Sequence, residues 1–293
     1  MLIAVPRETK PGEKRVALVP DIISKLTKAG LSVVIESNAG LASEYADEQF
    51  KAAGAQIKTG DVLAGSDVVL SVQPLTPSQM ALLKKGAITI SFLSPTTATD
   101  SINAAIAAGV TAISLEMVPR ISRAQSMDAL TSQALCAGYK ASLVAAELSP
   151  KFFPLLMTAA GTVTPAKVVV LGAGVAGLQA IATAKRLGAV VSAYDVRPSS
   201  ADEVKSMGAK FINLELEALE GAGGYAREMT EERASKQKEL LSPYIAAADV
   251  LITTAAVPGR TAPRLVTAEM VSKMAPGSVV VDLAAESGGN VEG

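Results

Sequence analysis

The chain contains no histidine and a single cysteine, Cys136, among its 293 residues. Histidine is the side chain most often used as a general base and as a metal ligand near neutral pH, so we expect neither histidine-dependent acid–base chemistry nor a metal site. One cysteine cannot form an internal disulfide, which favours a cytosolic location. Tryptophan is also absent and aromatic residues are only 3% of the chain, which suits helices packed closely on parallel sheets better than a β-sandwich.

Long hydrophobic runs and an excess of one charge are missing as well. No uninterrupted apolar run reaches the ~18 residues that a membrane span requires. The 27 basic residues nearly balance the 28 acidic ones, and the start MLIAVPRE shows no basic leader or cleavage site. The sequence therefore predicts no membrane span within this chain and no nucleic-acid partner, and it leaves small molecules and proteins as partners.

Length and hydrophobic rhythm indicate two α/β domains. From residue 1 to about 120, β-branched runs such as LIAV and LSVVIE alternate with Ala-rich helical stretches, the pattern of a parallel βαβ sheet. Residues 121–160 are predicted to be a helical connection, either one long helix or two joined near Gly138, and a second βαβ series fills 161–293. We expect two Rossmann-like doubly wound parallel-sheet domains joined by an interdomain helix, the first without a nucleotide fingerprint. The chain ends just after the apolar run SVVVDLA, so we expect the second domain to be truncated.

A glycine-rich turn follows an apolar run in the second domain. It consists of Gly172, Ala173, Gly174, Val175, Ala176 and Gly177. Glycines at this spacing permit a tight turn, a close approach of backbone amides to a pyrophosphate, and tight packing of the next helix, whose positive end faces the phosphates. The turn therefore predicts a dinucleotide site, and we expect NAD(H) to bind there, at the cleft.

The next predicted strand, AVVSAYD, ends at Asp195 and is followed by Val196 and Arg197. Asp195 lies 18 residues after Gly177, where a carboxylate can accept both hydrogen bonds of the adenosine ribose diol. This favours NAD over NADP, because a 2′-phosphate would meet a negative charge, although Arg197 offers such a phosphate a positive partner. The alternative is that Asp195 caps the helix predicted from Ser199.

A polar cluster lies within the 14 positions from 120 to 133: Arg120, Arg123, Gln125, Asp128, Thr131 and Gln133. Ser126 is a candidate helix cap, and Gln125, Asp128 and Thr131 recur every three residues, which predicts one polar stripe near the helix start. The stripe is either a solvated helix face or part of a site. Its position after a predicted strand and at the domain junction favours contact with a nicotinamide.

The segment LEALEGAGGYAREMT is too rich in glycine for a strand and too long for an ordinary connection. Tyr225 and Met229 within it are candidates for a mobile contact surface. The alternative is that both residues fold back as packing.

These residues together resemble the proton-translocating NAD(P) transhydrogenase family, in particular the NAD(H)-binding domain I of its α subunit. The resemblance extends along essentially the whole chain, and it rests on RETKPGEKRVALVP at 7–20, MVPRISRAQSMDAL at 117–130, VLGAGVAGLQAIATAKRLGA at 170–189, YDVRP at 194–198 and GAGGYAREM at 221–229. It implies a Re/Si-specific oxidoreductase in which hydride passes from NADH here to NADP⁺ in a separate NADP(H)-binding domain III. The transfer is coupled to proton movement through a transmembrane domain II. Domain I is expected as a homodimer at the cytoplasmic face of the inner membrane.

The resemblance also implies roles for individual residues. Arg120, Gln125, Asp128 and Thr131 would orient the nicotinamide, with Thr131 standing where a serine is more usual. Asp195 would bind the adenosine ribose, and Val196 and Arg197 beside it are expected to belong to the cofactor-binding site. Tyr225 and Met229 would belong to a mobile loop over the nucleotide. In the family a C-terminal stretch returns to the first domain and leads to the membrane, and we expect the truncated second domain to lack it.

Alanine dehydrogenase is the nearest competing family, because it shares both domains and a similar amino-terminal motif. That enzyme needs a substrate-binding lysine and a catalytic histidine, where this sequence aligns Gln73 and Ser94. Hydride exchange between two nicotinamides needs no acid or base, only two rings held together with water excluded. A transhydrogenase component is thus the main prediction. A stand-alone amino-acid dehydrogenase and a non-enzymatic NAD-sensing module are the alternatives.

Overall fold

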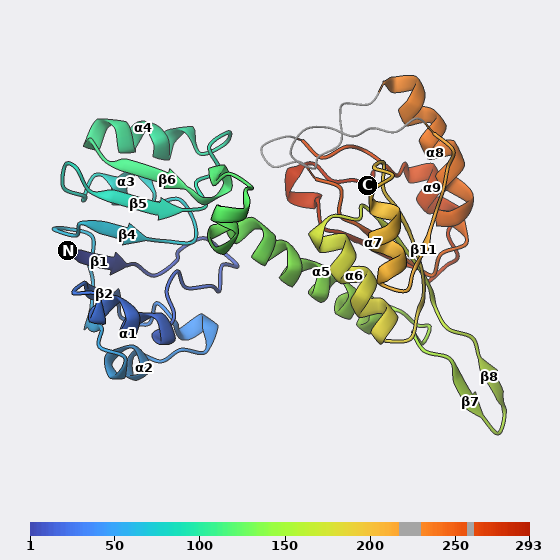
Figure 1. Ribbon diagram of the computed structural model, residues 1–293, viewed down its shortest axis with the longest axis horizontal. Coiled ribbons are helices and arrows are strands. Elements are labelled where there is room, and N and C mark those ends of the chain that lie inside the picture. Colours follow the sequence, from blue (N-terminus) through green and yellow to red (C-terminus); the bar gives the residue numbers. More distant parts are fainter. Residues whose placement is uncertain (217–229, 257–260) are drawn as a thin grey trace. The chain divides into compact units, whose positions relative to one another are not determined.

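The computed structural model describes residues 1–216, 230–256 and 261–293 (Figure 1). The chain forms two compact units, Met1–Ala129 and Leu130–Gly293. The domain boundaries predicted at residues 120 and 160 remain predictions.

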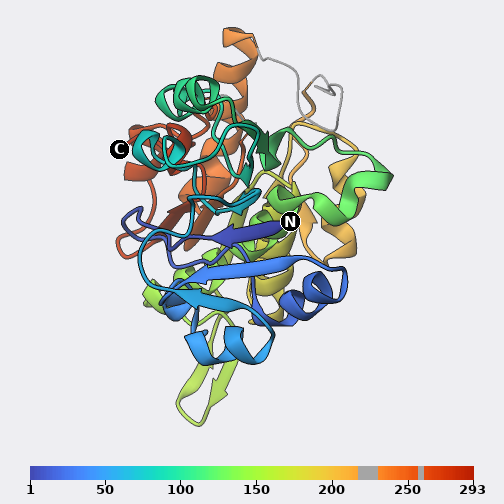
Figure 2. The ribbon, with the colours of Figure 1, turned by 90° about the vertical axis from the view of Figure 1, so that its left-hand side faces the viewer.

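The first unit is a six-stranded parallel sheet in the order β3-β2-β1-β4-β5-β6. Figure 2, in which this unit faces the viewer, shows neighbouring strands running in the same direction. Its strands are β1 (Leu2–Val5), β2 (Ser32–Glu36), β3 (Gln56–Lys58), β4 (Val68–Leu70), β5 (Ile88–Ser91) and β6 (Thr111–Ser114). Its helices are α1 (Pro20–Lys28), α2 (Asp47–Ala52), α3 (Pro77–Met80) and α4 (Thr99–Ala108), with 3₁₀ turns η1 (Leu41–Ser43), η2 (Leu115–Met117) and η3 (Ser122–Met127).

Alternation along the strands of this sheet builds two cores, because successive side chains point to opposite faces. Ile3 and Val5 of β1 pack in one cluster with Ile23 of α1 and Phe50 of α2. Ala4, between them, packs in a second cluster that includes Met80 of α3 and Ala105 of α4. The sheet is therefore doubly wound.

The second unit has a five-stranded parallel sheet in the order β11-β10-β9-β12-β13. The strands are β9 (Lys167–Leu171), β10 (Val190–Tyr194), β11 (Lys210–Phe211), β12 (Val250–Thr253) and β13 (Val279–Asp282). The helices are α5 (Ala129–Leu148), α6 (Val175–Arg186), α7 (Ser200–Ser206), α8 (Glu231–Ala246) and α9 (Ala268–Ser272), and η5 (Ala285–Ser287) follows β13. One long helix, α5, thus replaces the alternative of two helices joined near Gly138.

Both faces of the second sheet are again covered. Val168 and Val170 of β9 pack with Ile181 of α6 in one cluster, whereas Leu171 packs with Leu241 of α8 in the other. The parallel sheets confirm the predicted α/β fold class of two Rossmann-like units.

A two-stranded antiparallel hairpin, β7 (Leu156–Thr158) and β8 (Gly161–Val163), precedes this sheet. It projects from the body of the second unit in both views (Figures 1 and 2). Met157 is 80% exposed and Leu155 is 54% exposed. The sequence did not predict this hairpin, because its strands are too short to show a hydrophobic period.

Candidate nucleotide-binding site

The glycine turn lies where the sequence predicts it, between β9 and α6. Gly172 has φ +98°, a backbone conformation that side chains disfavour, and a Cβ there would lie 2.6 Å from Oγ1 of Thr254. A Cβ on Gly177 would lie 1.8 Å from the carbonyl oxygen of Gly172. Both residues must therefore be glycine for the turn to close against α6.

Gly174 differs from Gly172 and Gly177 because the space beside it is open. Apart from its chain neighbours and the nearby backbone of α6, no atom of the described residues lies within 4 Å of a Cβ built on it. Gly174 is the N-cap of the 12-residue helix α6, and within the described parts of the chain no side chain caps that helix. Open space therefore faces the positive end of a helix dipole, an arrangement that suits the pyrophosphate of a dinucleotide.

Asp195 follows β10 and contacts the glycine turn directly. The backbone N–H of Ala173 donates to its Oδ2 over 2.7 Å, and the N–H of Arg197 donates to its Oδ1 over 2.9 Å. Helix α7 begins at Ser200 and its N-cap is Ser199, so the alternative that Asp195 caps this helix is wrong. Asp195 instead links the end of β10 to the turn after β9.

Arg197 occupies the remaining acceptor sites of Asp195. Its Nε lies 2.9 Å from Oδ1 and its Nη2 lies 3.1 Å from Oδ2, and the Asp195 side chain is only 8% exposed. A carboxylate has about four lone-pair sites, and here each oxygen accepts two hydrogen bonds. A ribose diol could bind Asp195 only if the Arg197 guanidinium moved aside. Val196, between the two, is half-buried and packs against the hydrophobic cluster that includes residues of α8 and α9.

The polar cluster differs in part from the prediction. Residues 122–127 form the 3₁₀ helix η3, and α5 begins only at Ala129, so Ser126 does not cap that helix. Asp128, with ψ 82°, interrupts the helical backbone between Gln125 and Thr131. The predicted single stripe on one α-helix is therefore wrong, because the backbone changes from 3₁₀ to α within it.

The site residues of this cluster belong to different compact units. Arg120, Gln125 and Asp128 lie in the first unit and Thr131 lies in the second. Arg120 and Gln125 are exposed, and Asp128 and Thr131 are half-buried. Tyr225 and Met229 lie outside the described residues. The roles of all six remain predictions.

The first unit repeats the framework of the second without its glycines. The N–H of Arg7, two residues after β1, donates to Oε2 of Glu36, the last residue of β2, over 2.8 Å. This matches the bond from Ala173, two residues after β9, to Asp195, which directly follows β10. Where the second unit has Gly172, however, the first has Pro6. The carboxylate of a Rossmann turn is thus present in the first unit, but the phosphate-binding turn is not.

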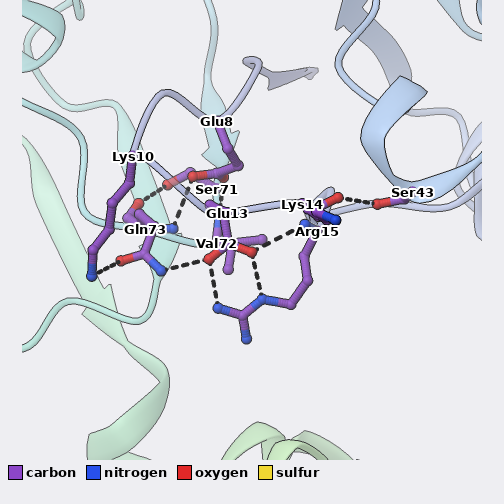
Figure 3. Close-up of polar contacts among 9 residues, drawn as sticks. All are labelled: Glu8, Lys10, Glu13, Lys14, Arg15, Ser43, Ser71, Val72 and Gln73. Carbon is purple, nitrogen blue, oxygen red and sulfur yellow. Dashed lines mark hydrogen bonds and ion pairs between the residues drawn. The ribbon is translucent and has the colours of Figure 1, made fainter. Parts of the chain in front are cut away.

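Glu8 stands in the first unit where Gly174 stands in the second, at the carboxyl ends of the parallel strands (Figure 3). Its carboxylate accepts the N–H of Val72 over 2.6 Å and the N–H of Gln73 over 3.2 Å, both just after β4. Burial raises the pKa of Glu8 above its usual value, although the two backbone hydrogen bonds oppose the shift. Because an acidic side chain already accepts from these two amides, they are unsuited to bind a phosphate. Glu8 also lines a cavity of about 600 Å³.

Glu13 links two neighbours of Glu8 (Figure 3). Its carboxylate accepts Nε of Arg15 over 2.7 Å and Nη2 of Arg15 over 2.6 Å, and it also accepts Nε2 of Gln73 over 2.6 Å. The hydrogen bonds from Arg15 lower the pKa of Glu13 to about 2. Arg15 and Gln73 are therefore both bound to an internal carboxylate, which competes with any carboxylate ligand for them.

Sequence reasoning missed the residues behind the glycine turn. Oγ1 of Thr254, just after β12, donates to the carbonyl oxygen of Gly172 over 3.1 Å. Asn290, with none of its surface exposed, bonds both backbone groups of Ala255. Neither residue belongs to a recognisable motif, and only a pairing of distant strands brings them to the turn.

Among the described residues, none of the helices has the length and apolar character needed to cross a membrane. Nor do the described parts of the chain hold a group of three or more acidic or cysteine side chains that could bind a metal ion.

Comparison with known proteins matches both units to one family. Residues 4–137 match the model of the alanine dehydrogenase/PNT N-terminal domain, and residues 141–293 match that of the alanine dehydrogenase/PNT C-terminal domain. An NAD(P) transhydrogenase subunit alpha protein of Rhodospirillum rubrum is 49% identical over 300 residues, covering 99% of this chain and 78% of the relative.

A solved transhydrogenase structure from Sinorhizobium meliloti superposes with a TM-score of 0.90 at 45% identity, covering 100% of this chain and 81% of that one. The alanine dehydrogenase of Bacillus subtilis is 32% identical, over 100% of this chain and 72% of the relative. Both branches of the family thus share the fold, and this chain is more similar to the two transhydrogenases.

Proposed function

Because the chain belongs to the alanine dehydrogenase/PNT family, we propose that it is the NAD(H)-binding component of a proton-translocating NAD(P) transhydrogenase. The observation that carries this proposal is the open glycine turn at Gly174, joined to Asp195 through Ala173, in a chain without histidine. The turn supports a dinucleotide ligand, and the missing histidine supports a reaction without acid–base steps.

The nucleotide bound here is NAD(H). The amides at the start of α6 would hold the pyrophosphate, and Asp195 would accept the ribose hydroxyls once Arg197 releases it. A carboxylate at this position disfavours a 2′-phosphate, which supports NAD(H) over NADP(H) on this component. NADP(H) binds to the partner domain III.

This component acts on the reaction by positioning. When bound, NADH supplies a hydride to NADP⁺ held by domain III, and a transmembrane domain II couples the transfer to proton translocation. Arg120, Gln125, Asp128 and Thr131 orient the nicotinamide ring, and the segment containing Tyr225 and Met229 excludes water. No group on this chain has to gain or lose a proton, so a His-free site is sufficient.

Partner domains and a second copy of this chain complete the enzyme at the cytoplasmic face of the membrane. The β7–β8 hairpin supports the homodimer, because Met157 at 80% exposure and Leu155 at 54% exposure would leave apolar surface in water. A hairpin that projects from one protomer can pack on another.

Alanine dehydrogenase activity is the second candidate, supported by the shared fold at 32% identity. Glu13 opposes the binding of a keto acid, because its carboxylate is bonded to Arg15 and Gln73 and so competes with the carboxylate of the substrate for both residues.

A mixed assay decides between the candidates. The chain is combined with a purified NADP(H)-binding domain, and hydride transfer from NADH to an NADP⁺ analogue is followed by absorbance. We expect transfer only when both proteins are present. Oxidation of NADH by the chain alone, dependent on pyruvate and ammonia, would establish the dehydrogenase instead. Nucleotide-dependent partner binding without hydride transfer in any mixture would indicate a sensing module.

A further inference from the structure

Asn290 is a buried amide whose side chain bonds backbone groups at two places after β12. Its Oδ1 accepts the N–H of Ala255 over 2.9 Å, and its Nδ2 donates to the carbonyl oxygens of Ala255 over 2.7 Å and of Pro263 over 2.9 Å. None of its surface is exposed. The side chain therefore fixes the direction in which the chain leaves β12.

The backbone that Asn290 holds lies directly against the glycine turn. Thr254 precedes Ala255, and its Oγ1 donates to the carbonyl oxygen of Gly172 over 3.1 Å. A Cβ built on Gly172 would meet this Oγ1 at 2.6 Å and the amide nitrogen of Ala255 at 3.1 Å. A shift of Thr254 and Ala255 would therefore displace the first glycine of the turn.

Asn290 is itself held in place from β13. Asp282, the last residue of that strand, accepts the N–H of Asn290 over 2.7 Å and the N–H of Val291 over 3.1 Å. The backbone carbonyl of Asn290 accepts two further N–H groups, from Leu265 and Val266. Because its backbone and its side chain are both bonded, Asn290 acts as a fixed point.

We infer that Asn290 is a positioning residue for the nucleotide site, because it holds Thr254 and Ala255 against Gly172 and so sets the shape of the glycine turn. The inference rests on the proposed function of the turn. The first unit gives a parallel: the N–H of Val72, which follows β4 as Ala255 follows β12, is bonded by the side chain of Glu8. In both units a distant side chain thus fixes the same backbone position.

An isosteric substitution tests this role. Asn290→Asp keeps the shape of the side chain but places an oxygen against the carbonyls of Ala255 and Pro263, which removes both donors and adds repulsion. We expect the dissociation constant for NADH to rise by about tenfold or more. Binding can be followed by NADH fluorescence, which is free of tryptophan background because the chain has none.

Asp249→Asn is the matched control for lost stability. Asp249 stands just before β12, and its Oδ2 bonds the N–H of Lys167 over 2.7 Å and Nζ of Lys151 over 2.9 Å. The control is the reverse exchange of the same two groups, an amide in place of a carboxylate, at the other end of β12. We expect it to lower the melting temperature while the affinity for NADH stays within about twofold of the unsubstituted chain, a change of less than ~0.5 kcal/mol.

Thr254 provides a second, milder test should Asn290→Asp fail to fold. Thr254→Val removes the hydroxyl that bonds Gly172 and should weaken NADH binding, whereas Thr254→Ser keeps the hydroxyl and should restore it. Equal NADH affinity of Thr254→Val and Thr254→Ser, or of Asn290→Asp and Asp249→Asn, would overturn the inference. Failure of the unsubstituted chain to bind NADH would overturn the proposed function itself, and this inference with it.

Discussion

The backbone N–H of Ala173 donates a 2.7 Å hydrogen bond to the carboxylate of Asp195. The bond joins the middle of the glycine turn to the end of the neighbouring strand, so the residue proposed to bind ribose also holds the turn in place. The bond from Arg7 to Glu36 repeats this link in the first unit, where the turn contains no glycine. The carboxylate therefore belongs to the framework of the fold, and only its combination with glycines makes a nucleotide site.

Replacement of Asp195 should weaken NADH binding more than it slows hydride transfer. Asp195→Ala removes the acceptor for both ribose hydroxyls, and hydrogen bonds to charged groups contribute about 1.5–3 kcal/mol, which corresponds to roughly a 10- to 100-fold rise in the dissociation constant for NADH. Hydride transfer at saturating NADH should change little, as single-turnover measurements with the partner domain can check. Asp195→Asn, which keeps an acceptor for Ala173, controls for the turn. An unchanged affinity in Asp195→Ala would remove Asp195 from the site.

Two glycines of the turn should respond in opposite ways to alanine. Gly174→Ala adds a methyl group where the described residues leave open space, so the melting temperature should fall only slightly, by the cost of a poorer N-cap, while NADH binding is lost to a clash with the pyrophosphate. Gly177→Ala places a Cβ 1.8 Å from the carbonyl of Gly172, so the second unit should lose about 1–3 kcal/mol or more of stability. Calorimetry and NADH titration of both variants separate the effects. Full NADH affinity in Gly174→Ala would show that the phosphates lie elsewhere.

Gln125→Asn shortens a side chain proposed to orient the nicotinamide, while keeping its amide. A displacement of about 1 Å in a positioned group can slow a reaction by on the order of 100-fold, so hydride transfer should fall far more than NADH affinity. Gln133→Asn, in the same polar segment, should leave both unchanged. Parallel losses of rate and affinity in Gln125→Asn would mean that Gln125 only binds.

The ion pair in the first unit predicts a dependence of stability on pH. The folded-state pKa of Glu13 is about 2, below the usual value of 4.5. The contribution of ionised Glu13 to the free energy of unfolding is therefore complete above pH 4.5 and is lost as the pH falls towards 2. Because Arg15 is 42% exposed, we expect Glu13→Gln to cost only about 1–3 kcal/mol at pH 7. The cost should shrink below pH 4.5. Urea unfolding followed by circular dichroism at several pH values measures the difference.

Glu269→Gln serves as the control for this effect. Glu269 of α9 pairs with Lys273, the residue that follows this helix, but their side chains are 76% and 51% exposed, so the loss of the pair should not be measurable. A pH-independent difference between Glu13→Gln and the unsubstituted chain would contradict the assignment of the low pKa to Glu13.

Local patterns in the sequence predicted the elements that depend on local physics. Strand alternation, the glycine turn and the carboxylate after β10 follow from period, spacing and φ, and each lies where it was expected. Arg197 shows the limit of such reasoning. Its position beside Asp195 was visible, but its bonding to both carboxylate oxygens depends on side-chain packing. Ser126 failed as a cap because the chain takes a 3₁₀ path before α5.

Contacts between residues far apart in the chain could not be predicted from the sequence. Asn290 reaches Ala255 across 35 positions, and Glu8 reaches Val72 across 64, and no spacing pattern relates the two ends of either contact. Both pairs form only because parallel strands bring loops to the same edge of a sheet. The residues that shape a site from behind are therefore the ones that composition and spacing miss.

The β7–β8 hairpin should hold the proposed homodimer together. Met157 exposes apolar surface on it, as does Leu155 just before β7. A charged residue in a buried dimer contact would be costly to desolvate. Met157→Glu should therefore convert dimers to monomers in sedimentation experiments, while NADH affinity stays the same because the glycine turn lies outside the hairpin. Met207→Glu, at a 41% exposed position just after α7, is the matched control and should remain dimeric. A dimer that survives Met157→Glu but dissociates with Met207→Glu would place the contact on the sheet domain instead, since the two variants carry the same charge and differ only in location.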